Sequence, residues 1–155
     1  MKKIASFTVD HRVITEGIYI SRIDGDVTTY DLRTRKPNCN DYMDNETMHT
    51  FEHMFATFVR NSSIADDVLY FGPMGCQTGF YLLVKNAKHE TVRKVIENVL
   101  KSIIDHTGEI FGASEIECGN YKSLNLQKAK DEAIRFLDCL SRDDNNFIYP
   151  KGAEL

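Results

Sequence analysis

The chain has 155 residues, of which 42% are hydrophobic and 27% are charged, which is enough for one domain with an apolar core and too apolar for a disordered chain. Its 19 basic and 23 acidic side chains give a formal net charge of −4 without a long run of like charges, which argues against a nucleic-acid partner. The longest apolar stretch runs only from Phe80 to Val84. A membrane-spanning helix needs about 18 apolar residues, so no membrane partner is expected either.

We expect a cytoplasmic protein, because polar residues between Ser6 and His11 interrupt any apolar stretch behind Lys2 and Lys3 that could act as a secretion signal. In a reducing compartment the four cysteines are expected to be thiols or metal ligands rather than disulfides. Residues 1–155 are predicted to form a single domain. The polar residues that follow the last predicted helix predict a mobile tail over 141–155.

The first predicted elements are a β-hairpin and a helix. Residues 17–35 contain two runs of β-branched and aromatic side chains, which are joined through Asp24-Gly25-Asp26. A helix is predicted to follow and to end near Arg60, and either Asp44 or Asn45 could cap its start.

The second half of the chain predicts three strands and two helices. Residues 68–71 and 79–84 are expected to be strands around a turn rich in glycine and proline. Apolar residues at helical spacing predict helices over 92–104 and 126–140, with a short strand at 114–118 between them. This order predicts an α+β fold, a mainly antiparallel β-sheet with helices packed on one face.

The first predicted helix carries the sequence His49-Thr50-Phe51-Glu52-His53. At about 100° per residue, the two histidines and Glu52 project from one side of the helix, opposite its apolar residues. Two imidazoles one turn apart can bind one divalent ion, and a nearby carboxylate can move protons. The pentad therefore favours a metal site over its alternative, an exposed helix face with two unrelated histidines.

Two cysteines are candidates for the rest of this site. Cys118 could be a third metal ligand, because Gly119 after it lets the backbone turn sharply beside an ion; the alternative is a small buried apolar residue. Cys76 lies in a turn between two predicted strands, where a thiolate near a cation could serve as a base. For Cys76 the residues alone slightly favour the alternative, a packed turn residue.

Several segments together resemble the LuxS family of S-ribosylhomocysteine lyases in their order and spacing. The resemblance covers about residues 6–140. The segments that carry it are Ser6–His11, Tyr30–Arg33 with the following Pro37-Asn38, His49–His53, Pro73–Tyr81 and Cys118–Tyr121.

This resemblance implies a homodimer with a metal site near the subunit interface in each protomer. His49, His53 and Cys118 would hold one divalent ion per subunit, with water as the fourth ligand. The native ion is expected to be iron(II), and zinc or cobalt could replace it in a purified sample, since the ligands accept all three. Glu52 and Cys76 would form the acid/base pair.

The resemblance also implies a substrate and a reaction. Ser6, His11 and Arg33 would contact the substrate from the neighbouring subunit. The expected lyase reaction converts S-ribosylhomocysteine to homocysteine and 4,5-dihydroxy-2,3-pentanedione, the precursor of the quorum-sensing signal autoinducer-2. Two isomerisations of the aldose–ketose type would move the carbonyl along the sugar, and β-elimination would then release the thiol.

The sequence departs from the family pattern at three places. Thr34 and Arg35 follow Arg33 where the family usually has Phe-Cys, and Phe71-Gly72 replaces the usual Ile-Ser. Residues 16–22 also differ from the stretch that the family commonly has there. These departures concern the substrate contacts and the N-terminal strand rather than the metal ligands.

Two other functions remain open from the residues alone. One is a metallohydrolase with an inverted H-x-x-E-H motif, in which Glu52 would activate a metal-bound water. The other is a non-catalytic structural zinc module, which would need Cys76 as a fourth ligand to close the site.

Overall fold

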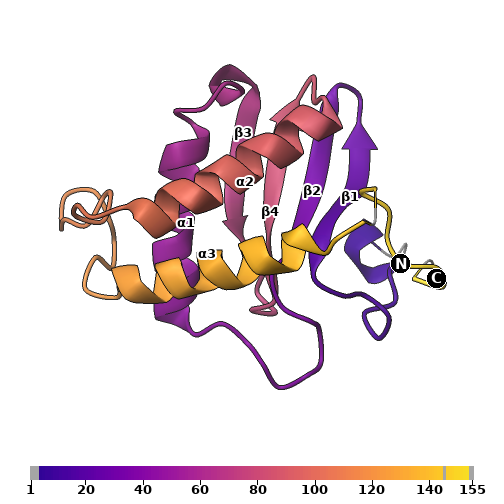
Figure 1. Cartoon of the computed structure of the whole chain (residues 1–155), viewed down its shortest axis with the longest axis horizontal. Coiled ribbons are helices and arrows are strands. Elements are labelled where there is room, and N and C mark those ends of the chain that lie inside the picture. The colour runs from indigo at the N-terminus through magenta and orange to yellow at the C-terminus, as the bar shows by residue number, and fades with distance from the viewer. Residues whose placement is uncertain (1–3, 145, 154–155) are drawn as a thin grey trace.

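Alternation of apolar and polar residues along the strands places one face of a β-sheet against helices. We describe a computed structural model of the chain, which covers residues 4–144 and 146–153. Figure 1 shows its helices and strands, which in chain order are η1 (Ala5–Phe7), β1 (Gly17–Asp24), β2 (Val27–Arg33), α1 (Asn45–Val59), η2 (Ala65–Asp67), β3 (Val68–Pro73), β4 (Gly79–Lys85), α2 (His89–Asp105) and α3 (Leu126–Ser141).

The sheet confirms the predicted fold class. Its strand order is β1-β2-β4-β3, and each neighbouring pair is antiparallel. Figure 1 shows the long helices on one side of the sheet, with α2 and α3 running across it. Within the described residues, no helix is both long enough and apolar enough to cross a membrane.

Side-chain alternation on β2 separates the core from the opposite face of the sheet. Tyr30 and Leu32 belong to the buried core under the helices. The residues between and after them, Asp31 and Arg33, therefore point to the other face. This alternation decides where the polar groups of the candidate site lie.

Helix α1 packs on the sheet through stacked aromatic rings. Phe51 and Phe55 of the helix stack on Phe80 and Phe71 of the strands, with ring centroids 4.8 Å and 4.2 Å apart. All four side chains are buried in the core. Because the apolar side of α1 faces the sheet, its histidine side faces away from the core.

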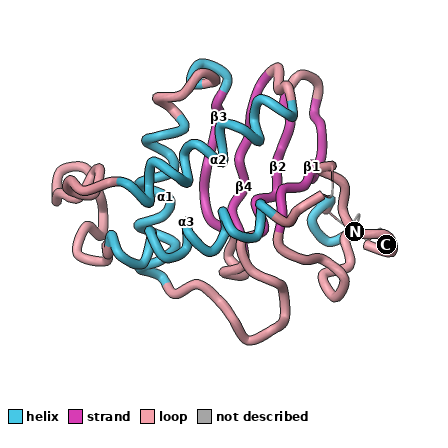
Figure 2. Tube along the Cα trace, in the orientation of Figure 1, coloured by secondary structure: helices cyan, strands magenta, loops and turns pink. Residues whose placement is uncertain are grey.

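The segment predicted as a strand at 114–118 is instead a series of turns, so that prediction was wrong. The backbone N–H groups of Glu117 and Cys118 both donate to the carbonyl of Ser114, at 3.1 Å and 3.0 Å. Ile116 is 97% exposed. A strand needs a neighbouring strand for its backbone hydrogen bonds, and this loop instead lies beside α1 (Figure 2).

The segment after α3 packs against the sheet, which differs from the tail expected from its polar composition. Ile20 in β1 donates its backbone N–H to the carbonyl of Phe147, and Phe147 and Ala153 are both buried. The ring of Tyr149 stacks on Tyr19 of β1, with centroids 4.6 Å apart. Asn145 and residues 154–155 of the expected tail lie outside the described residues.

Asp44 caps the N-terminus of α1, and its substitution tests how much the capping hydrogen bond stabilises the protein. Its carboxylate accepts from the backbone N–H of Thr47 at 2.8 Å and from Lys128 Nζ at 2.6 Å. We expect Asp44→Ala to lower the free energy of unfolding by about 1 kcal/mol, because an orphan N–H of the first turn loses its acceptor. Urea unfolding at pH 7 measures the change, and equal stability of the two proteins would contradict the prediction.

The same residue predicts a pH dependence. The bond from Lys128, followed by those from Thr47, lowers the pKa of Asp44 from 3.8 to about 2. A lowered folded-state pKa means that the stabilising contribution of Asp44 is complete above pH 3.8 and is lost as the pH falls toward 2. Asp44→Asn, which keeps a capping oxygen without the charge, is the matched control and should lack this dependence.

Candidate metal and substrate sites

Three side chains that are far apart in the sequence meet beside α1. The ligand atoms of His49, His53 and Cys118 all lie within 4.8 Å of one another. Cys118 Sγ is 3.3 Å from His49 Nε2, and the two imidazole rings are nearly perpendicular, with centroids 4.7 Å apart. Within the described ranges, this is the one group of three or more His, Cys, Asp or Glu side chains arranged to share an ion.

Hydrogen bonds to the backbone orient both histidines. His49 Nδ1 donates to the carbonyl of Ser123, and His53 Nδ1 donates to the carbonyl of Phe111, each at 2.8 Å. In a neutral imidazole the proton on Nδ1 leaves the lone pair on Nε2 available for a metal ion. Both acceptors belong to the loop between α2 and α3, which also carries Cys118.

The loop reaches the histidines because of its local conformation. Gly112 has a φ of +68°, and a Cβ at this position would lie 3.2 Å from His53 Nδ1. Glycine therefore allows both the turn and the close approach to the ring. The backbone N–H of Asn120 donates to Cys118 Sγ at 3.4 Å.

The donor set fits a divalent metal ion. In a tetrahedral zinc site the metal–nitrogen and metal–sulfur distances are about 2.0 and 2.3 Å, so neighbouring ligand atoms lie about 3.5 Å apart. The ligand atoms of the His-His-Cys group lie within 4.8 Å of one another, and its three ligands are one fewer than the four of a tetrahedral zinc site. His49, His53 and Cys118 could therefore hold a metal ion, as expected from the sequence.

Glu52 lies between the two histidines on α1 and is half-buried. Among the described residues its carboxylate has no hydrogen bond or ion pair, unlike that of Glu46 on the same helix, which pairs with Lys128. An unpaired carboxylate beside a possible metal position is free to accept and donate protons.

The other predicted residues form a second cluster on the opposite face of the sheet. Ser6, His11, Arg33 and Cys76 line one cavity of about 350 Å³. Cys76 is exposed, and its Sγ lies 3.1 Å from Thr78 Oγ1 and 3.8 Å from Arg33 Nη1. Cys76 therefore lies in a cleft beside a cation, and the alternative of a packed turn residue does not describe it.

Arg33 is held by a buried ion pair that sequence reasoning missed. Arg33 and Asp31 are 2% and 1% exposed, and Nε and Nη2 of Arg33 donate to the two carboxylate oxygens at 3.1 and 2.6 Å. Burial is the largest single effect and lowers the pKa of Arg33, but the charge of Asp31, its hydrogen bonds and smaller contributions together raise the pKa overall. A spacing of two on a strand, which puts both residues on one face, was the signal that could have found Asp31.

Tyr81 is a second residue that the sequence did not suggest. It lies on β4 two residues after Gly79 and lines the cavity beside Cys76. Burial, followed by the charge of Asp31, raises the pKa of its hydroxyl, so that it remains a hydrogen-bond donor at neutral pH.

The two clusters are separate within one chain. Cys118 borders a cavity of about 280 Å³ that shares no lining residue with the cavity beside Cys76. In the part of the chain that the structure describes, no hydrogen bond or ion pair links Glu52 to Cys76. The structure thus brings together the three candidate metal ligands and, elsewhere, the three candidate substrate contacts with Cys76.

Comparisons with known proteins point to one family. The model of the family described as S-Ribosylhomocysteinase (LuxS) matches residues 4–147. An S-ribosylhomocysteine lyase of Clostridium beijerinckii is 42% identical over 158 residues, which cover 97% of this chain and 99% of that protein. One from Borreliella afzelii is 42% identical over 157 residues, which cover 97% of this chain and 100% of the relative.

Metal content tests the division between the two clusters. We expect Cys118→Ala to lose nearly all bound metal, because two imidazoles alone hold a divalent ion weakly, whereas Cys76→Ala should keep about one ion per chain. Elemental analysis of protein purified in the presence of iron(II) or zinc measures this. Cys39→Ala, which removes an exposed thiol in a loop, is the control, and metal loss in Cys76→Ala instead of Cys118→Ala would reverse the assignment.

Proposed function

Because this chain belongs to the S-ribosylhomocysteinase (LuxS) family, we propose that it is a carbon–sulfur lyase that cleaves S-ribosylhomocysteine to homocysteine and 4,5-dihydroxy-2,3-pentanedione. The observation that carries this proposal is the match over nearly the whole chain together with a His-His-Cys group suited to a metal ion. The second product is the precursor of autoinducer-2, so the reaction would serve quorum sensing and the release of homocysteine.

The proposed metal ligands are His49, His53 and Cys118, with one divalent ion per subunit. The native ion is proposed to be iron(II), and zinc or cobalt could occupy the same ligands in a purified sample. When bound, the ion would supply Lewis-acid polarisation of a sugar carbonyl. The loop carbonyls of Ser123 and Phe111 keep both imidazoles in the orientation that this requires.

Glu52 and Cys76 are the proposed proton carriers. Each isomerisation moves a proton from the carbon next to the carbonyl to the former carbonyl carbon and another from the hydroxyl oxygen to the carbonyl oxygen, which two groups on opposite sides of the sugar can carry. In the last step a proton leaves the carbon next to the carbonyl and the bond between sulfur and the following carbon breaks. The sulfur takes up a proton and departs as homocysteine, and the enol that remains tautomerises to the dione. Arg33 Nη1 lies 3.8 Å from Cys76 Sγ, and both side chains line the same cavity.

Ser6, His11 and Arg33 are the proposed substrate contacts. They line the cavity that contains Cys76 and offer a hydroxyl, an imidazole and a guanidinium. These groups suit the hydroxyls and the carboxylate of S-ribosylhomocysteine. The departures at Thr34 and Arg35 leave this cavity intact, since Thr34 is buried and Arg35 pairs with Glu132 and Asp41.

A homodimer would bring the two clusters together. The long helices cover one face of the sheet (Figure 1), whereas Tyr70 on the other face is 51% exposed. Thr29, Tyr81 and Leu83 line a cavity of about 450 Å³ on this second face. We propose that a second copy of the chain packs there and that the metal group of one protomer faces the substrate cavity of its partner.

The alternatives are less well supported. A structural zinc module would need Cys76 as fourth ligand, but the group of side chains that could share an ion does not include it. The inverted metallohydrolases resemble this chain only in the pentad, and their third ligand is a glutamate rather than Cys118. A cytoplasmic location is part of the proposal, because the site needs Cys76 and Cys118 as free thiols.

Release of thiol from S-ribosylhomocysteine tests the activity. Metal-loaded protein should release homocysteine, and titration of free thiol with a chromogenic disulfide measures the rate. Cys76→Ala should keep its metal but lose turnover by at least about a thousand-fold, as expected when an acid/base group is removed. Cys39→Ala should be as active as the unmodified protein. An absence of thiol release from the metal-loaded protein would reject the proposed function.

Mixing inactive variants tests the composite site. If Glu52 and Cys76 act from different protomers, a heterodimer of Glu52→Gln and Cys76→Ala chains contains one intact site. Random exchange makes half of the dimers mixed, so activity should return to about a quarter of the unmodified value. The mixed dimer is verified with two different affinity tags. If mixed dimers form without activity, both residues act within one protomer.

A further inference from the structure

A segment after α3 lies across the edge strand β1, and we call residues 146–153 the C-terminal strap. The backbone N–H of Ile20 donates to the carbonyl of Phe147 at 2.8 Å, and the Phe147 side chain belongs to the core. The carbonyl of the buried Ala153 accepts from the backbone N–H of Asp10 at 2.6 Å. The strap thus joins the core to the segment that carries a proposed substrate contact.

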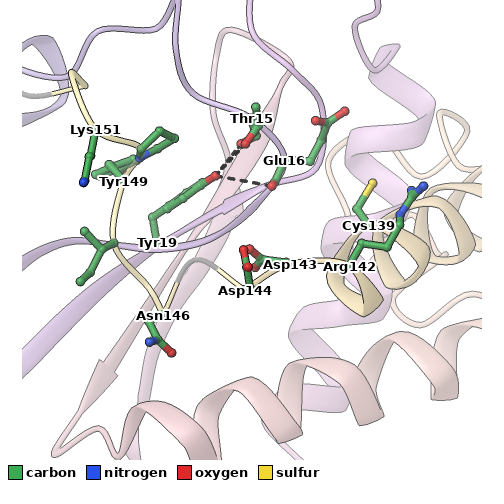
Figure 3. Close-up of a pocket in the computed structure, with 12 residues that line it drawn as sticks. Thr15, Glu16, Tyr19, Cys139, Arg142, Asp143, Asp144, Asn146, Tyr149 and Lys151 are labelled. Carbon is green, nitrogen blue, oxygen red and sulfur yellow. Dashed lines mark hydrogen bonds between the residues drawn. The ribbon is translucent and has the colours of Figure 1, made fainter.

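Tyr149 in the strap reaches the functional face of the sheet. Figure 3 shows its ring beside that of Tyr19, next to a cavity of about 800 Å³. The hydroxyl of Tyr19 donates to the backbone carbonyl of Thr15 at 3.0 Å. The hydroxyl of Tyr149 instead donates to Asp31 Oδ2 at 2.8 Å. The two stacked rings therefore have different hydrogen-bond partners.

Asp31 is a buried carboxylate that accepts hydrogen bonds from Arg33, which lines the substrate cavity, and from Tyr149, which does not. One oxygen accepts from Arg33 Nε, and the other accepts from Arg33 Nη2 and from the Tyr149 hydroxyl. A buried charge needs its lone pairs satisfied, and the second oxygen depends on Tyr149 for half of its bonds. Burial, followed by the charge of Asp31, raises the pKa of Tyr149, so that this hydroxyl stays protonated as a donor.

Asp31 in turn determines the direction of the guanidinium. Because Arg33 uses Nε and Nη2 for Asp31, its remaining Nη1 points to Thr78 Oγ1 at 2.7 Å and to Cys76 Sγ at 3.8 Å. The guanidinium is planar, so a rotation of the carboxylate would turn Nη1 away from the cavity.

We propose that Tyr149 is a positioning residue, which acts through Asp31 to hold Arg33 in its substrate-binding orientation. This inference rests on the proposed function and extends it to a residue that lies outside the Cys76 cavity and outside the family motifs. The substrate half of the site is then assembled by the C-terminal strap as well as by the sheet.

Tyr149→Phe tests this role, because it removes the hydroxyl and keeps the ring that stacks on Tyr19. We expect the KM for S-ribosylhomocysteine to rise about five-fold, since Arg33 spends less time in the orientation that binds substrate, while kcat changes less than about two-fold. A variant that was only less stable would lose active protein and hence apparent kcat, with KM unchanged. Steady-state thiol release gives both constants, and a thermal melt reports the folded fraction.

Tyr19→Phe is the matched control. It removes the phenol hydroxyl from the other ring of the stacked pair, but that hydroxyl does not donate to Asp31. We expect its KM to stay within about two-fold of the unmodified protein. An unchanged KM for Tyr149→Phe, or the same increase for both variants, would overturn the proposal.

Asp31→Asn tests the contact between Asp31 and Arg33. It also tests the proposal if Tyr149→Phe does not fold. The amide keeps the size of the side chain but loses the charge that orients Arg33, so KM should rise at least as much as for Tyr149→Phe. An unchanged KM in folded Asp31→Asn would contradict the proposal. The unmodified protein, assayed alongside, separates the two claims: if it releases no thiol the proposed function fails, and if it is active while the variants keep its KM only the role of Tyr149 fails.

Discussion

The candidate metal site depends on two hydrogen bonds between α1 and the loop that follows α2. The Nδ1 atoms of His49 and His53 donate to carbonyls of Ser123 and Phe111, and these bonds give both rings one orientation. The same bonds attach the loop to the helix, and the loop carries Cys118 to within 3.3 Å of His49 Nε2. Without these two bonds, nothing in the turns of residues 111–123 would fix the position of the Cys118 thiol beside His49.

The packing of the core also determines which side of α1 carries the candidate metal ligands. Stacking of Phe51 and Phe55 on the sheet determines the rotation of α1, and this rotation turns Glu52 away from the core. On the other side of the sheet, alternation along β2 places Arg33 beside Cys76. A single chain thus holds two separate clusters of candidate residues, and this separation is the physical reason for proposing a second copy.

Local signals predicted α1 well, because its features depend on neighbours in the sequence. The cap at Asp44, the stretch to Val59 and the shared side of His49 and His53 all follow from helical spacing. The prediction of a strand at 114–118 was wrong, because a strand needs a neighbouring strand and a short segment of sequence does not show whether one is available. The structure nevertheless places Cys118 beside His49, and Cys118 stays a candidate ligand because the reason to choose it was its chemistry and not its secondary structure.

Helical spacing and capping patterns could not predict contacts between residues that are far apart in the sequence. Asp31 lies in a segment that carries the family resemblance, but no role for it was predicted from the sequence. Its importance comes from Arg33 on the same strand face and from Tyr149, which is 118 residues away in the chain. The packing of the segment after α3 was missed for a similar reason. Its composition is polar, but Phe147 and Tyr149 provide the few contacts that attach it to the sheet.

The position of the strap has a consequence for biosynthesis. Ser6, His11, Arg33 and Cys76 all emerge from the ribosome before Tyr149, so a nascent chain can pair its strands before the group that steadies Asp31 has been made. Until the C-terminal strap has been made and has packed, Asp31 can accept hydrogen bonds only from Arg33 and from water. The hydrogen bond from Tyr149 to Asp31 therefore forms after the strands of the sheet have been synthesised.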